Sequence, residues 1–100
     1  MKYSYRVFFS MEDDNTCCRA EIPGLDMSIP VMCEGMKPLQ IEHAVKIDLL
    51  TTLYVMELDG EELPEDKPCE LIGYDWQTVL TVDTTEAPKI VKSVKRIELT

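Results

Sequence analysis

The chain has 100 residues, of which 45% are hydrophobic, which suits one small folded domain and argues against general disorder. Its 19 acidic and 10 basic residues give a formal net charge of −9, which repels nucleic-acid phosphates and attracts basic partners. No stretch reaches the roughly 18 apolar residues of a membrane span, and the N-terminus is typical of a strand rather than a secretory signal. We therefore expect an acidic, cytoplasmic protein.

The charges are distributed unevenly along the chain. Residues 1–88 hold 18 acidic and 6 basic residues, whereas residues 89–100 hold 4 basic residues and 1 acidic residue. In the second segment Lys92, Lys95 and Arg96 suit a solvated strand, which is the favoured interpretation, or a weak contact with nucleic acid. The sequence thus predicts a body over 1–88 and a basic extended segment over 89–100.

Residues 1–9 predict the first strand, because their side chains alternate between two faces. Aromatic and aliphatic residues fall on one face: Tyr3, Tyr5, Val7 and Phe9. Mostly polar residues fall on the other face: Lys2, Ser4, Arg6 and Ser10. The polar, acidic segment 11–15 that follows is typical of a hairpin turn.

Two more strands are predicted before the middle of the chain. Residues 16–22 alternate again, and Pro23-Gly24 closes the strand. Its inward residues are Cys18, Ala20 and Ile22. Residues 27–33 predict a third strand, in which Pro30 favours an edge position or a bulge, because proline has no N–H to donate.

The segment from Pro38 to about Leu58 has helical periodicity, with Pro38 in the first turn and a stop signal at Asp59-Gly60. It carries two apolar stripes, and a helix that is apolar on two sides is normally buried on two sides. The first stripe contains Ile41, Val45, Leu49, Leu53 and Met56; the second contains Ala44, Ile47, Tyr54, Val55 and Leu58. We expect one stripe to cover the sheet and the other to meet a second element or a partner.

The rest of the chain predicts an acidic, proline-bearing loop over 61–68, a short irregular element over 69–74, a strand over 77–83 and an extended segment over 89–99. The expected fold class is therefore α+β. A small antiparallel sheet, built in the order β-β-β-α-β with a further C-terminal strand, is covered by one main helix.

Few residues suggest catalysis or metal binding. His43 is the only histidine, and the four cysteines form no CxxC pair, so we expect neither a catalytic site nor a metal site nor a cofactor. The carboxylates cluster on a turn and a loop rather than on strands. A Cys–His43 pair and a carboxylate-based metal-dependent nuclease remain open as less favoured alternatives.

Several segments together form a specific pattern. The chain opens with Met1-Lys-Tyr-Ser-Tyr5, turns a corner at Glu21-Ile-Pro-Gly-Leu25, carries Ile41-Glu-His-Ala44 in its helix and continues as Asp59-Gly-Glu-Glu-Leu-Pro64. Over residues 1–88 this pattern resembles the HicB family, the antitoxins of HicA–HicB toxin–antitoxin pairs. The chain departs from the family at the helix start, where Met36-Lys37 replaces an Asp-Thr cap, and at Asp26-Met27, where the family favours Pro-Gly.

The resemblance implies a partial ribonuclease-H-like fold that binds and neutralises a small, basic, RNA-cleaving HicA toxin. It also implies co-repression of the operon by promoter DNA binding if a DNA-binding module follows. Independently of the resemblance, we expect a homo-oligomer, because a spare apolar stripe or an open sheet edge favours self-pairing. Residues 94–100 resemble the first strand of a ribbon-helix-helix module without its helices. Whether the chain stops before such a module or the protein lacks operator binding stays open.

The expected toxin contacts combine one helix stripe with the acidic loop. They are Glu42, Leu49, Leu53, Met56, Glu61 and Glu62. Two other functions remain as alternatives: a small metal-dependent nuclease of ribonuclease-H-like ancestry, and a homo-oligomeric structural domain that pairs through the spare stripe or an open sheet edge.

Overall fold

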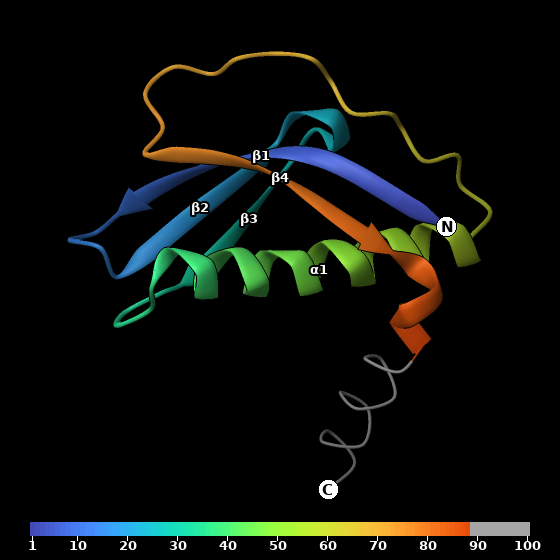
Figure 1. Ribbon diagram of the computed structural model, residues 1–100, viewed down its shortest axis with the longest axis horizontal. Coiled ribbons are helices and arrows are strands. Elements are labelled where there is room, and N and C mark those ends of the chain that lie inside the picture. Colours follow the sequence, from blue (N-terminus) through green and yellow to red (C-terminus); the bar gives the residue numbers. More distant parts are fainter. Residues whose placement is uncertain (89–100) are drawn as a thin grey trace, which may run out of the picture.

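The computed structural model describes residues 1–88, in which the elements follow the order β-β-β-α-β (Figure 1). The strands are β1 (Lys2–Glu12), β2 (Cys17–Ile22), β3 (Met27–Met32) and β4 (Trp76–Asp83); the helix is α1 (Pro38–Leu58); short 3₁₀ helices are η1 (Pro23–Leu25) and η2 (Thr84–Glu86). The α+β class is confirmed. The predicted C-terminal strand, with Lys92, Lys95 and Arg96, lies outside the described residues.

The four strands form one open antiparallel sheet in the order β3-β2-β1-β4. β1 is the long inner strand: β4 pairs with its residues 2–9, whereas β2 pairs only with its residues 8–12. β3 lies at one edge of the sheet, as Pro30 predicts. The hairpin turn between β1 and β2 places Asp13, Asp14 and Asn15 at positive φ, which these residue types tolerate better than most.

The helix has the predicted bounds. Pro38 occupies its first turn, and the Lys37 N–H donates to Gln40 Oε1 (2.7 Å), which replaces the missing side-chain cap. At the other end Gly60 has φ +74°, the left-handed conformation that terminates helices. No helix within residues 1–88 is both long enough and apolar enough to cross a membrane.

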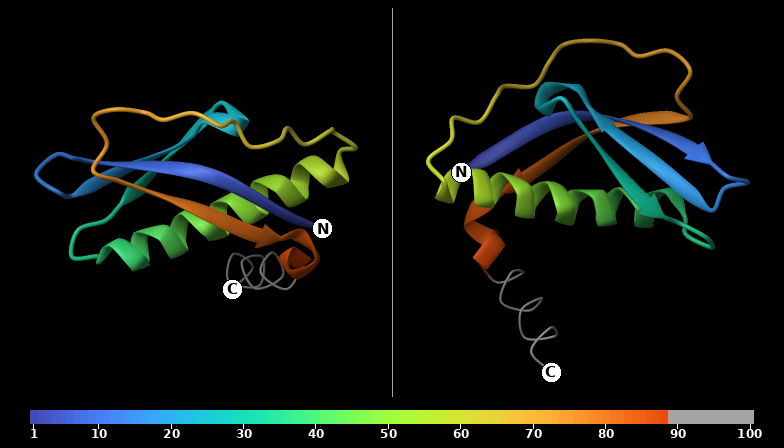
Figure 2. Two further views of the ribbon diagram at one scale, coloured as in Figure 1. Left: turned by 45° about the horizontal axis from the view of Figure 1, so that its top comes forward. Right: turned by 180° about the vertical axis from the view of Figure 1, so that it is seen from behind.

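The core lies between α1 and the inner face of the sheet (Figure 2). Tyr5, Val7 and Phe9 of β1 are buried there, as their alternation predicts. The inward residues of β2, Cys18, Ala20 and Ile22, are buried as well. Phe8, which points to the outer face, is equally buried at 1% exposure, and Tyr74 packs edge-on against it with 5.7 Å between ring centroids. The outer face is therefore partly covered too.

The cover of the outer face is the long loop between α1 and β4. Because β4 runs antiparallel to β1, the chain leaves the end of α1 and returns across the sheet before β4 begins (Figures 1 and 2). Helix and loop thus lie on opposite sides of the sheet. This loop spans residues 59–75.

Candidate functional site

The sequence prediction assigned the wrong helix stripe to the partner. Leu49 and Leu53 are completely buried against the sheet, together with Ile41 and Val45, so neither leucine can contact a partner of the folded chain. The expectation that one stripe covers the sheet is correct, but the covering stripe is the one that was expected to be spare.

The second stripe faces outward and is exposed near the C-terminal end of α1. Val55 is 47% exposed and Leu58 is 67% exposed, whereas Ile47 and Tyr54 of the same stripe are half-buried. Large exposed aliphatic side chains on one helix face are common features of interaction surfaces when they lie together. Val55 and Leu58 therefore replace Leu49 and Leu53 as the apolar contact candidates.

Glu42 and Met56, the other two helix candidates, take part in internal packing. Glu42 Oε2 accepts a hydrogen bond from Trp76 Nε1 (3.1 Å), and the Trp76 ring stacks on Phe9 with 4.6 Å between centroids and 2° between planes. Met56 is half-buried and packs against the core. The geometry gives Glu42 a structural role, in which its carboxylate orients the indole that covers one end of the core.

Glu61 and Glu62 are exposed, as the partner prediction requires. They follow Asp59 directly after α1, and the last turn of the helix carries no basic residue. The C-terminal end of a helix has a partial negative charge of its own, so these carboxylates reinforce it instead of balancing it. We define the acidic helix end as Val55, Leu58, Asp59, Glu61 and Glu62. It combines exposed apolar area with concentrated negative charge.

The loop that follows is fixed to β1 at its start and at its end. The Tyr5 hydroxyl donates to the Pro64 carbonyl, and Asp66 binds Arg6 twice: Oδ2 lies 3.3 Å from Nε, and Oδ1 accepts from the backbone N–H at 2.9 Å. The Arg6 N–H points to the side of β1 that faces β2, but β2 pairs only with residues 8–12 of β1. Asp66 therefore accepts the hydrogen bond that a neighbouring strand would otherwise accept.

Asp75 fastens the far end of the loop in the same manner. Its Oδ2 accepts from the Met11 N–H (2.7 Å), and its own N–H donates to the Phe9 carbonyl (2.8 Å). Arg6 Nη1 also donates to the Cys69 carbonyl (3.2 Å) in the middle of the loop. These contacts hold the acidic segment in a defined position relative to the helix end.

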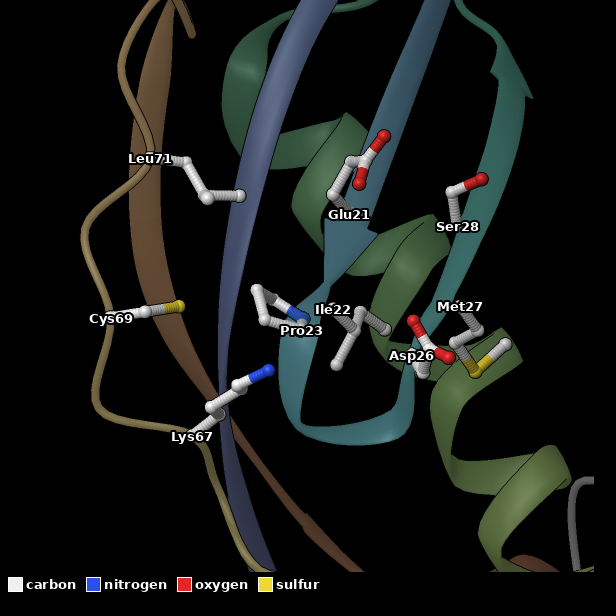
Figure 3. Close-up of a pocket in the computed structure, with 9 residues that line it drawn as sticks. All are labelled: Glu21, Ile22, Pro23, Asp26, Met27, Ser28, Lys67, Cys69 and Leu71. Carbon is white, nitrogen blue, oxygen red and sulfur yellow. The ribbon is translucent and has the colours of Figure 1, made fainter.

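A pocket of about 380 Å³ lies between the loop and the outer face of the sheet (Figure 3). Lys67, Cys69 and Leu71 extend from the loop toward the strands, and Glu21 and Ser28 form the opposite wall. The remaining lining residues are Ile22, Pro23, Asp26 and Met27. No ion pair within residues 1–88 joins Lys67 to the carboxylates of this pocket. The mixed lining has no feature that selects one class of ligand.

The thiols divide into two buried and two accessible groups. Burial raises the pKa of the Cys18 thiol to about 11, with a smaller contribution from the nearby Cys33 thiol, and burial also raises the pKa of Cys33. Cys17 and Cys69 are partly exposed. A raised pKa keeps a thiol protonated and unreactive at neutral pH. Cys18 and Cys33 therefore act as small core residues.

His43 is exposed on α1, and the sheet separates it from Cys17 and Cys69, which lie on the outer side. The geometry rules out a Cys–His pair with either of these accessible thiols. Within residues 1–88, no three histidine, cysteine or carboxylate side chains are placed to share a metal ion.

Comparison of the chain with protein-family models, with curated proteins and with solved structures found no match. The fold is an open four-stranded antiparallel sheet covered by one helix. Folds of this general kind serve many unrelated functions, so the fold alone does not indicate what the chain does. The acidic helix end and the loop are therefore the features of this chain that indicate function.

Sequence reasoning missed the residues that fasten the loop: Tyr5, Arg6, Asp66 and Asp75. One signal was available. Phe8 is a large apolar residue at an outward position of a strand, which indicates that something covers the outer face. Which loop residues provide the cover could not be read from the pattern, because the Arg6–Asp66 contact spans 60 positions in the chain.

Proposed function

We propose that this chain is an antitoxin-type interaction protein with a HicB-like body, which binds and neutralises a small, basic, RNA-cleaving toxin of the HicA kind. The observation that supports the proposal is the position of the segment Asp59–Pro64, which carries the most specific part of the sequence resemblance. Its acidic residues are exposed, and it adjoins the exposed Val55 and Leu58.

The chemistry of this surface suits a basic protein partner. From Asp59 to Glu70 the loop holds six acidic residues against Lys67 alone. Opposite charges accelerate the encounter of two proteins, while exposed aliphatic side chains supply the desolvated centre that gives an interface its lifetime. Val55 and Leu58 provide the aliphatic part, and Asp59, Glu61 and Glu62 provide the adjoining charge.

A cleavage assay tests the proposal. The probe is the small basic protein encoded by the gene next to that of this chain, incubated with RNA in the absence and presence of one equivalent of the chain. We expect RNA cleavage to fall at least tenfold when the chain is present. As a control, the chain alone is incubated with RNA and Mg²⁺ or Mn²⁺.

Two results would overturn the proposal. The first is a neighbouring gene that encodes no such protein, or one whose RNA cleavage continues at the same rate in the presence of the chain. The second is metal-dependent RNA cleavage by the chain alone that disappears on substitution of a single carboxylate, because it would favour a nuclease.

A further inference from the structure

The two edges of the sheet differ in how they are protected. At the β3 edge, the Cys33 N–H donates inward to the Thr16 carbonyl (3.0 Å), so by alternation Pro30 directs its missing N–H to the open side. Natural proteins commonly place proline, charge or a bulge on exposed edges to prevent pairing with another chain. β4, the opposite edge strand, contains no proline and no charged residue from Trp76 to Val82.

The main-chain groups of β4 that face outward can be assigned from its pairing with β1. The Thr84 N–H donates to the Met1 carbonyl (3.0 Å), and Leu80 lies opposite Tyr5, so even-numbered residues bond to β1. Odd-numbered residues therefore direct their N–H and C=O groups to the edge. These are Gln77, Val79 and Thr81, which pair with no strand within residues 1–88.

The chain that follows β4 turns away from this edge. The Thr84 hydroxyl donates to Glu57 Oε2 of α1 (3.2 Å), and Ala87 is buried in the core. Both contacts lead residues 84–88 toward the helix side of the sheet and not alongside β4 (Figure 1).

Charge limits where two copies of this acidic chain could meet. With a net charge of −9, a self-contact is most favourable where carboxylates are few. The segment from Trp76 to Val82 holds none, and Glu70 of the loop is the carboxylate that lines a pocket with Gln77 and Val79. Val79, at the centre of this segment, is 58% exposed on the outer side of the strand.

We propose that β4 pairs with β4 of a second copy of this chain across a two-fold axis at Val79. In this antiparallel register Val79 lies opposite Val79, and Gln77 lies opposite Thr81. All three residues direct main-chain donors and acceptors to the partner, as hydrogen-bonded pairs require. The two sheets become one continuous sheet, and the uncharged side chains meet on its outer side. This inference does not depend on the proposed function.

Light scattering of the full chain over a concentration series tests the inference, with Val79→Lys as the test variant and Ser28→Lys as its control. Both substitutions add one lysine to an exposed position of an edge strand, but only Val79→Lys places two lysines opposite each other at the axis. We expect the wild type and Ser28→Lys to reach twice the mass of one chain. Val79→Lys should require at least tenfold higher concentration to do so.

A wild type that stays monomeric throughout the series, or a Val79→Lys variant that dimerises like the control, would overturn the inference. The second result would place the contact elsewhere, for example at the acidic helix end. If Val79→Lys fails to fold, hydrogen exchange of the wild type decides: the amides of Gln77, Val79 and Thr81 must become protected as concentration rises, and unchanged exchange contradicts the pairing.

Discussion

Leu53 and Leu58 stand on the same helix but in opposite environments. Leu53 is fully buried beneath the sheet, whereas Leu58 is 67% exposed. The free energy of unfolding that is lost when a leucine is truncated depends on the cavity it leaves. Truncation should therefore destabilise the chain at Leu53 and have little effect on stability at Leu58.

We expect Leu53→Ala to lower the free energy of unfolding by about 2–5 kcal/mol, because it opens a cavity in the core. Leu58→Ala should change it by less than about 0.5 kcal/mol, as is usual for exposed positions. Urea denaturation of both variants measures the difference. Equal losses in the two variants would show that the helix is oriented differently.

The thiols give a second prediction at this scale. In the native chain at pH 8, Cys17 and Cys69 should react rapidly with a thiol-specific chromophore, whereas Cys18 and Cys33 should not, because they are buried and have raised pKa values. All four should react in denaturant. Rapid modification of all four thiols in the folded protein would contradict the described packing of β2 and the end of β3.

At the scale of elements, the sequence predicted most bounds well because local signals marked them. Pro38 and Gly60 delimit α1, and alternating side chains delimit β2 and β4. The end of β1 was predicted too early: the strand continues to Glu12 and includes Met11, which was expected in the turn, because pairing with β2 extends it. The orientation of α1 was predicted incorrectly for a physical reason: both stripes are apolar, so a helical wheel does not show which one the sheet covers. Only the packing in the folded chain shows that the sheet covers Leu53 and leaves Val55 exposed.

The loop between α1 and β4 leads to a prediction about a single contact. Asp66→Ala removes the ion pair with Arg6 and the acceptor for its N–H. Both side chains are partly exposed, so we expect a loss of only about 1 kcal/mol in unfolding free energy. Hydrogen exchange at the Arg6 amide should nevertheless accelerate at least tenfold.

Glu65→Ala is the matched control, because it removes the adjacent, exposed carboxylate. It should leave exchange at the Arg6 amide unchanged. If Asp66→Ala has no effect on that amide either, the loop is not fastened to β1 in the manner described.

At the scale of the whole molecule, the route of the chain was the least predictable feature. The order of elements was expected, but the antiparallel direction of β4 requires a return across the outer face of the sheet, and no local pattern specifies that return. The consequence concerns the helix end: the chain is fixed to the sheet at Tyr5 and Arg6 a few residues after Glu61 and Glu62, which limits where these two exposed carboxylates can lie relative to Leu58.

We expect the acidity of this surface to make the binding of a basic protein depend on salt. Binding of a basic protein should weaken as salt is raised, mainly through slower association, because screening shortens the range of attraction to about 8 Å at physiological ionic strength. Stopped-flow measurement at two salt concentrations checks this expectation. An association rate that is independent of salt would assign the recognition to apolar contacts alone.

We expect the acidic helix end to bind the basic partner. The most direct test is the affinity of this chain for the neighbouring gene's basic protein, used as a variant that no longer cleaves RNA. The variant pair is Glu61→Lys/Glu62→Lys and, as control, Glu34→Lys/Asp48→Lys, which makes the same change in net charge at exposed positions outside the acidic loop. Calorimetry should show that the first double variant binds at least tenfold more weakly than the control. Equal affinity of the two double variants would contradict the account.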